Sequence, residues 1–421
     1  MHILLACYTF PPALGIGGRR WAKYAKGLAQ AGHHVHVLCA EAVPGRAGSS
    51  WTEDVKHDRI HLYPLPRRYP KVATLWDRTH VWNDLRYRAW MKVLPHLTQG
   101  NHIDLAIFWR AVFMRKAEEL IARHPIRHII ASGAPFRLLV HAAELKKRHP
   151  ELHLTADLRD PWTWGRQYDI QRLSPRRMAQ EKTMEALVME MANIVTAPSP
   201  DMVAHLRSAY PQHAHKYHEL PHAVDPDDIP ANPFERHSPP RRLIYAGSWR
   251  GKEDGHAYMD AVINTFRRIL SNMQPGGLPP VFDIYARPNE VLDARQQVEQ
   301  VGLEGSIRFH GVVNGREAGR HIADADAALV FIPDENRNYL GTKFNELFHQ
   351  RIPVVHVGAP GRISRFIESN RLGVSITVQE VEKELPKLIS GERPILVDTN
   401  FDTGPVILDH LSKHLVALME A

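Results

Sequence analysis

The stretch from Tyr8 to Glu41 reads YTFPPALGIGGRRWAKYAKGLAQAGHHVHVLCAE. An apolar segment at residues 3–8 leads into it and predicts a buried strand. A turn with two prolines and three glycines follows, then a helical pattern, and then a second apolar segment at residues 35–39. A glycine-rich turn between a strand and a helix lets backbone N–H groups approach a phosphate. This stretch therefore predicts an α/β fold that binds a phosphate compound.

The glycines leave three kinds of site open. A nicotinamide or flavin enzyme would need a third glycine, after Gly15 and Gly17, at the position of Arg20, whose long side chain would prevent close packing of helix on strand. Glu41, at the place of a ribose-binding acid, favours that alternative. A purely structural turn is the second alternative. We favour the third, a looser loop in which Gly17 and Gly18 contact an anion at a helix N-terminus.

Strand and helix patterns alternate along all 421 residues, a length that predicts two domains. Residues 225–242, rich in proline and charge, read as a linker. We therefore predict an α/β protein with two doubly wound, Rossmann-like domains facing across a cleft, at residues 1–235 and 236–402. Residues 403–421 are expected to form a helix that packs back on the first domain. One of the predicted strands lies at residues 105–108.

The composition excludes several classes of protein. No apolar run approaches the roughly 20 residues that span a bilayer, and no signal peptide is recognisable, so we expect a cytoplasmic protein. Cys7 and Cys39 are expected to be reduced, buried thiols. The 27 histidines show no ligand spacing on a predicted helix, and the acids of DADA at 324–327 open a buried strand, so we expect no metal.

The basic charge lies in the first half of the chain. Lys and Arg number 31 against 23 Asp and Glu in residues 1–235, but 22 against 23 in residues 236–421. In residues 65–97, basic residues interleave with aromatic ones, which suits an anionic membrane surface, a lipid phosphate or a nucleic acid. A solvated helix with inward-packed aromatics is the plain alternative. Our prediction is an anionic membrane surface and no nucleic acid, with contacts through Arg67, Arg68, Lys71, Arg86 and Arg88.

Three segments resemble glycosyltransferases of the GT-B fold, of the family 4 type. FPPALGIGGRRWAKYAKGLAQAGHHVHVLCA, from Phe10, resembles their N-terminus, and LTADLRDPWT, from Leu154, resembles a segment of a bacterial branch that builds cell-surface glycans. Residues 339–376 resemble the segment that holds the sugar nucleotide. The resemblance implies transfer of a sugar from a nucleotide-sugar donor to a glycan or lipid-linked acceptor at the inner face of the membrane. It also implies retention of configuration, with no cofactor and no metal.

The predicted donor site lies in the second domain. Lys343 and Glu346 are three residues apart and so share one face of a predicted helix. A cation and the amides near Thr342 suit a diphosphate, whereas a carboxylate suits ribose hydroxyls. The basic pair that the family places after the first strand of this domain corresponds to Arg250 and Lys252, which would stabilise the leaving diphosphate without a metal.

Two departures from the family pattern bear on catalysis. The first glutamate of a Glu–seven residues–Glu pair falls at Asn338, and ASGAPF at 131–136 replaces a histidine-bearing segment. The resemblance therefore leaves Asp160, with Arg159, as the predicted catalytic group of the first domain. Asp157, still within the preceding strand, is expected to face inward and bond backbone amides.

Two other functions stay open at this point. One is a sugar-nucleotide epimerase of GT-B fold, which needs no acceptor. The other is a non-catalytic subunit that binds a sugar nucleotide. A test with the donor alone separates them from a transferase, because an epimerase converts the donor and a binding subunit leaves it intact.

Overall fold

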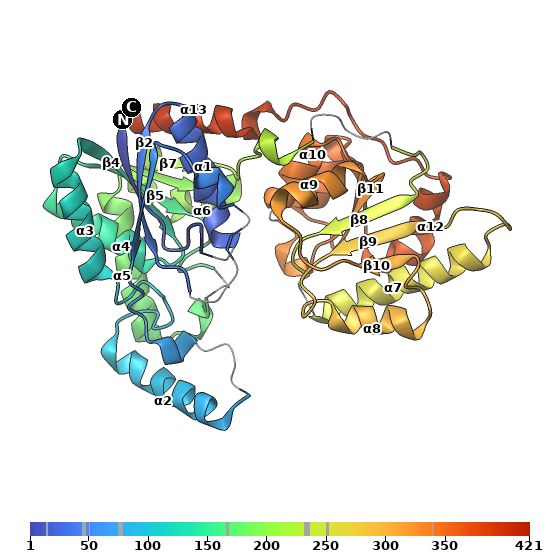
Figure 1. The fold of residues 1–421 in the computed structure, drawn as a ribbon, viewed down its shortest axis with the longest axis horizontal. Coiled ribbons are helices and arrows are strands. Elements are labelled where there is room, and N and C mark those ends of the chain that lie inside the picture. The colour runs from blue at the N-terminus through green and yellow to red at the C-terminus, as the bar shows by residue number, and fades with distance from the viewer. Residues whose placement is uncertain are drawn as a thin grey trace. The chain divides into compact units, whose positions relative to one another are not determined.

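The computed structural model describes residues 1–13, 16–43, 48–49, 51–74, 79–165, 168–230, 236–249, 252–338 and 340–421. For residues 16, 252–254 and 342 it describes the backbone. The chain forms two compact units (Figure 1). Unit 1 comprises Met1–Pro221 and Leu408–Ala421, and unit 2 comprises His222–Ile407.

Unit 1 contains a parallel sheet of seven strands in the order β3-β2-β1-β4-β5-β6-β7. The strands are β1 His2–Ala6, β2 His34–Ala40, β3 Ile60–Leu65, β4 Ile126–Gly133, β5 His153–Leu158, β6 Ile194–Ala197 and β7 Tyr217–Glu219. The helices are α1 Arg19–Gln30, α2 Val81–Leu97, α3 Arg110–Arg123, α4 Arg137–Arg148, α5 Pro175–Met191, α6 Pro200–Ala209 and α13 Leu408–Glu420. Most residues of these strands are buried, because helices cover a parallel sheet on both faces.

Unit 2 contains a parallel sheet of six strands in the order β10-β9-β8-β11-β12-β13. The strands are β8 Arg242–Ala246, β9 Val281–Tyr285, β10 Ile307–Phe309, β11 Ala327–Phe331, β12 Val354–Val357 and β13 Gly373–Ile376. The helices are α7 Lys252–Ser271, α8 Leu292–Gln300, α9 Gly315–Ala323, α10 Thr342–His349, α11 Arg362–Ser369 and α12 Val381–Ser390. Separate apolar cores on the two faces of this sheet pack α7, α8 and α12 on one face and α9, α10 and α11 on the other.

Both sheets confirm the prediction of two doubly wound α/β domains. In each sheet the order of the strands reverses beside the first strand, between β1 and β4 in unit 1 and between β8 and β11 in unit 2. Ligands of such sheets bind at the carboxyl ends of the strands near this point of reversal. The turns after β1, β4, β5 and β8 are therefore the places where a functional site is expected.

The boundary between the units differs from the predicted linker. Residues that follow Pro221 already pack within unit 2: Val224 pairs with Ile407, and the carbonyl oxygen of His222 accepts a hydrogen bond from Asn345. The compact units therefore divide before the proline-rich segment, not after residue 235. The C-terminal helix α13 packs against α1 in unit 1, where Gly27 leaves room for a residue of α13.

The strand predicted at residues 105–108 is wrong. Asp104 accepts hydrogen bonds from the backbone N–H groups of Ala106, at 2.9 Å, and Arg137, at 3.0 Å. A carboxylate that bonds the backbone two residues further on stabilises a turn. The chain makes consecutive turns there until α3 begins, although its apolar side chains match those of a strand.

Two further features concern the chemistry of the chain. Cys7 and Cys39 are buried free thiols, and burial raises the pKa of both to about 12.

None of the helices in the described part of the chain combines the length and the apolar character needed to cross a bilayer.

Candidate functional site

Arg159 connects three turns at the carboxyl end of the unit 1 sheet. It follows β5, and its guanidinium donates hydrogen bonds to the carbonyl oxygens of Gly17, at 2.8 Å, and Ala134, at 3.3 Å. Its Nε atom donates to Oδ2 of Asp160 at 3.0 Å. Burial alone would lower the pKa of Arg159, but the neighbouring Asp160 carboxylate outweighs it and the pKa is raised. Arg159 therefore stays a cation that holds the turns after β1, β4 and β5 together.

Asp160 is held by one of its two carboxylate oxygens. Oδ2 accepts a second hydrogen bond, at 2.8 Å, from the hydroxyl of Tyr168, a residue with a left-handed backbone at φ 60°. Within the described residues Oδ1 accepts none, and 22% of the Asp160 side chain is exposed. Burial, followed by the Asp160 charge, raises the pKa of Tyr168 to about 12. The carboxylate is thus oriented by two donors and keeps one oxygen for a further partner.

The glycine loop is packed closely in the structure. Gly17 and Gly18 form the short helical turn Ile16–Gly18 that leads into α1. A Cβ atom on Gly17 would lie 2.6 Å from the Arg159 guanidinium, and one on Gly18 would lie 2.9 Å from the carbonyl oxygen of Thr9. Neither position has room for a side chain. The carbonyl of Gly17 binds Arg159, and the predicted contact of the N–H groups with an anion stays a prediction.

Asp157 faces inward, as predicted, but its partners are side chains and not backbone amides. Arg20 binds both of its oxygens, with Nη2 at 2.8 Å from Oδ1 and Nε at 3.2 Å from Oδ2. Trp21 Nε1 and the hydroxyls of Ser132 and Thr196 donate to it as well, at 2.8, 3.0 and 2.8 Å. These donors, led in electrostatic effect by Arg20, outweigh burial and lower the Asp157 pKa. Arg20, whose size argued against a dinucleotide turn, is instead a buried ion-pair partner of β5.

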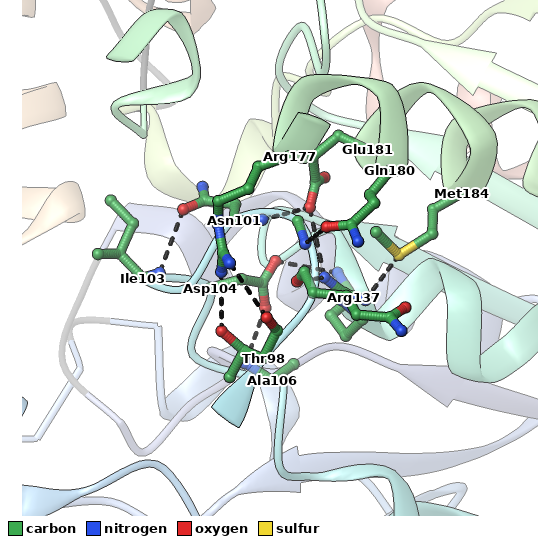
Figure 2. A network of polar contacts seen from close by, with 12 residues as sticks. Thr98, Asn101, Ile103, Asp104, Ala106, Arg137, Arg177, Gln180, Glu181 and Met184 are labelled. Atoms are coloured by element: carbon green, nitrogen blue, oxygen red, sulfur yellow. Dashed lines mark hydrogen bonds and ion pairs between the residues drawn. The ribbon is translucent and has the colours of Figure 1, made fainter. Parts of the chain in front are cut away.

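The turn after Asp160 rests on a polar network beneath it. Trp162 Nε1 donates to Oε2 of Glu181 on α5 at 2.6 Å. Oε1 of Glu181 accepts from the backbone N–H of Asn101, at 2.5 Å, and from Arg137, at 3.3 Å (Figure 2). Burial raises the pKa of the neighbouring Asp104 to about 6. Sequence reasoning missed this network, because its members come from distant segments without a shared motif.

In unit 2, the structure brings α10 to the turn after β8. Lys343 Nζ lies 4.0 Å from the centre of the Tyr245 ring, at the end of β8. A Cβ atom on Gly247 would lie 2.8 Å from Cε of Lys343, and Gly247 has φ 141°, so this turn requires glycine. Glu346 lies one turn further along α10 and, like Lys343, is half-buried. Lys343 of the predicted donor site therefore lies against the turn after β8, at the carboxyl end of this sheet.

The other predicted donor residues are described less fully. Arg250 lies outside the described residues. Lys252 is the first residue of α7 and Thr342 the first of α10, and the backbone of each is described. Asn338 has a structural partner: its Oδ1 atom accepts a hydrogen bond at 3.0 Å from the N–H of Arg362, at the start of α11.

Helix α2 carries the aromatic part of the basic segment and extends from the body of unit 1 (Figure 1). Its exposed large apolar side chains are Val81, Trp82, Leu85, Trp90, Val93 and Leu97. Arg86, Arg88 and Lys92 are exposed beside them, and Leu94 is buried. Trp82 is 70% exposed, so the alternative of inward-packed aromatics does not describe this helix, whereas Trp76 lies outside the described residues.

The rest of the predicted basic surface lies near the start of unit 1. Arg67 donates from Nε to the carbonyl oxygen of Glu41 at 2.7 Å, and its guanidinium lies 5.5 Å from the centre of the Tyr8 ring. Arg68 and Lys71 are exposed. Arg67 thus has a packing role in unit 1, while the exposed cations suit a surface contact.

No protein-family model and no curated protein sequence matches the chain. Solved structures match its fold over its full length. WaaG, a glycosyltransferase involved in lipopolysaccharide biosynthesis, is 14% identical with a TM-score of 0.53, over 100% of this chain and 95% of that chain. The lipopolysaccharide outer core galactosyltransferase WaaB is 12% identical with a TM-score of 0.58, over 100% and 99%.

A third similar structure contains a sugar nucleotide. The E. coli protein titled trehalose-6-phosphate, bound with UDP-2-fluoro glucose, is 12% identical with a TM-score of 0.60, over 100% of this chain and 99% of that chain. These likenesses, together with the two parallel sheets, show that the chain has the GT-B glycosyltransferase fold.

Proposed function

We propose that the chain is a glycosyltransferase that moves a sugar from a nucleotide-sugar donor to a glycan or lipid-linked acceptor in cell-surface polysaccharide synthesis. The observation that carries the proposal is the meeting of α10, with Lys343 and Glu346, and the glycine turn after β8 in a chain of GT-B fold. One cation, helix amides and a carboxylate lie within two turns of one helix, and a nucleoside diphosphate needs all three.

The donor binds unit 2 through its diphosphate and ribose. Lys343 and the first amides of α10, at Thr342, bind the diphosphate, because a helix N-terminus and an ammonium group both favour an anion. Glu346, one turn along, accepts hydrogen bonds from the ribose hydroxyls. Arg250 and Lys252 are assigned to the same diphosphate on sequence grounds, as are Gly17 and Gly18 in unit 1.

Transfer proceeds with retention and without a metal or cofactor. The cations around the diphosphate stabilise its charge as the glycosidic bond breaks, and a donor phosphate oxygen takes the proton of the acceptor hydroxyl. Asp160 is the catalytic residue of unit 1, with Oδ1 orienting an acceptor or sugar hydroxyl. Arg159 is a positioning residue, since its bonds go to Asp160 and to the carbonyls of two turns.

The acceptor is held at the inner face of the membrane by the basic surface of unit 1. Trp82 and Trp90 on α2 are exposed beside Arg86 and Arg88, which is the composition of an interfacial helix. The enzyme is thus cytoplasmic and peripheral. Flotation with vesicles of phosphatidylglycerol should show binding that falls as salt rises, and phosphatidylcholine vesicles are the control. Absence of binding at low salt would leave a soluble acceptor.

The experiment that tests the function is a binding screen over UDP-, GDP-, dTDP- and ADP-sugars, followed by turnover assays with the best binder. Stabilisation by one nucleotide class, with turnover that requires an added acceptor extract, supports a transferase. Conversion of the donor alone supports an epimerase, and binding without turnover a binding subunit. Failure of every donor to bind at millimolar concentration overturns the proposal.

A further inference from the structure

Several histidines lie close together at the amino ends of the strands in the unit 1 sheet. Arg159 and Asp160 lie at the opposite, carboxyl end of the same sheet. His2 opens β1, His34 and His36 lie at the start of β2, and His61 lies in β3. The parallel register pairs His2 with His34 and His36 with His61. His124, which ends α3 just before β4, joins them, with its ring 4.3 Å from that of His36. Four separate segments of the chain thus supply imidazoles to one place.

The ring nitrogens of three of these histidines lie close together. Nδ1 of His2 lies 3.0 Å from Nε2 of His36, and the ligand nitrogens of His2, His36 and His124 all lie within 4.8 Å of one another. Tetrahedral zinc with bonds of about 2.0–2.1 Å spaces its ligands about 3.4 Å apart. Small movements of the side chains, within about 1.5 Å, bring the three nitrogens to that spacing.

The surroundings of these three histidines match those of a zinc site with three protein ligands. His36 is buried, and its Nδ1 atom lies 3.4 Å from the Tyr63 hydroxyl, which is the kind of outer contact that orients a ligating imidazole. His2 and His124 are half-buried, so the metal can enter from solvent and a water molecule can take the fourth position. Imidazole ligands select zinc, copper or nickel over magnesium or calcium.

We propose that His2, His36 and His124 form a site for a divalent late transition metal, Zn²⁺ by preference, that links β1 and β2 to the end of α3. Within unit 1 the site lies at the amino end of the sheet, whereas Arg159 and Asp160 follow the carboxyl end of β5. Its metal therefore stabilises unit 1 by binding the folded state, and has no part in the transfer reaction. This proposal stands independently of the proposed function.

The test is zinc binding to the full chain without a polyhistidine tag, by calorimetry and by Co²⁺ absorption in the visible region. We expect one Zn²⁺ per chain with a micromolar or tighter Kd, and a melting temperature that rises with zinc. His124→Gln should weaken binding at least tenfold. His215→Gln, at an exposed histidine outside the cluster, is the matched control and should change nothing.

A second variant guards against misfolding. His2→Gln, near the start of β1, should weaken zinc binding to the same extent if His124→Gln fails to fold. The proposal is overturned if the chain binds no zinc at 100 µM, or if both variants bind it as tightly as the control does. Tetrahedral Co²⁺ bands that persist in both variants would place the metal elsewhere and overturn it as well.

Discussion

The first six strands of the two sheets have the same order, but one buried carboxylate of each sheet, Asp157 and Asp326, lies at the opposite end from the other. In unit 1, Asp157 lies at the carboxyl end of β5 and binds the side chains of Arg20, Trp21, Ser132 and Thr196. In unit 2, Asp326 lies just before β11, at the amino end. It accepts hydrogen bonds from the backbone N–H groups of residues 237, 241 and 242. The carboxyl end of unit 1 is therefore braced by side chains.

This difference separates scaffold from site. Both oxygens of Asp157 have several donors, so this carboxylate is part of the scaffold. Asp160, three residues later, has both of its donors on Oδ2, and the turn after β8 in unit 2 has glycine and the Lys343 side chain. A carboxylate such as Asp157, whose two oxygens both accept hydrogen bonds, belongs to the scaffold. A carboxylate such as Asp160, which has donors within the described residues on one oxygen alone, marks a place where a ligand can bind.

The largest expected effect tests the scaffold assignment. Asp157→Ala leaves the guanidinium of Arg20 buried without its carboxylate, a change that costs about 3–5 kcal/mol in the free energy of unfolding. Urea unfolding followed by circular dichroism measures it. The control is Glu53→Ala, an exposed partner of Lys56, which should change stability by less than about 1 kcal/mol. A loss below about 1 kcal/mol for Asp157→Ala would contradict the scaffold assignment.

The next effect tests whether Asp160 is functional. Asp160→Asn should fold normally, bind donor with nearly unchanged affinity and lose transfer by roughly a hundredfold, the scale of a lost proton-handling or positioning group. Tyr168→Phe, which removes one donor to Oδ2 and keeps the carboxylate, should lose less. The melting temperature and kcat are measured on one preparation. A destabilised variant with wild-type kcat would make the pair with Arg159 structural.

A smaller effect concerns the donor in unit 2. Glu346→Ala should raise the donor Kd by roughly tenfold, because a hydrogen bond to a charged group contributes about 1.5–3 kcal/mol. Glu368→Ala, at an exposed glutamate of α11, is the matched control and should leave donor binding unchanged. Isothermal titration with the best donor of the screen measures both. Equal affinities in the two variants would remove Glu346 from the site.

The smallest effect comes from a buried histidine of unit 2. His356 in β12 is fully buried, with Nδ1 2.7 Å from the Ser375 hydroxyl, and burial lowers its pKa from 6.5 to about 4. The unfolded chain therefore binds the proton first as pH falls below 6.5. As pH falls from 7 to 5.5, this histidine should lower the free energy of unfolding by about 1 kcal/mol, and the loss is regained as pH rises through 6.5.

Comparing His356→Asn with wild type measures this contribution. The variant should show a smaller fall in the urea midpoint between pH 7 and 5.5. His141 in unit 1, whose pKa is also lowered to about 4 by burial, is unchanged in both proteins. Identical pH dependence in the two proteins would contradict the assignment to His356.

The sheets were predictable because parallel strands buried on both faces need continuous apolar segments, such as residues 243–246 and 327–331. Residues 105–108 have the same pattern and form turns, because a single carboxylate, that of Asp104, bonds the backbone. Apolar pattern thus reports burial, and a local side-chain bond can still decide the backbone conformation.

The sequence predicts where the candidate site of unit 1 lies, but not which residues form hydrogen bonds with Asp160. The place of Asp160 after a strand and before proline follows from the sequence. The neighbours of Asp160 could not be predicted. Gly17 is 142 residues away from Arg159 in the sequence, and Tyr168 has a left-handed backbone although it is not a glycine. The histidine cluster escaped a search for helical spacing because strand register, not a helix, assembles most of it.

The helix α13 has a consequence for the order in which the chain is made. Its buried face, with Leu411 and Leu415, completes unit 1 beside Gly27 of α1, yet a ribosome synthesises all of residues 222–407 before it. Unit 1 must therefore wait, with part of α1 uncovered, until unit 2 has emerged. A fragment of residues 1–221 corresponds to that waiting state, so dissecting the chain requires that the last helix be supplied in trans or joined by a permuted connection.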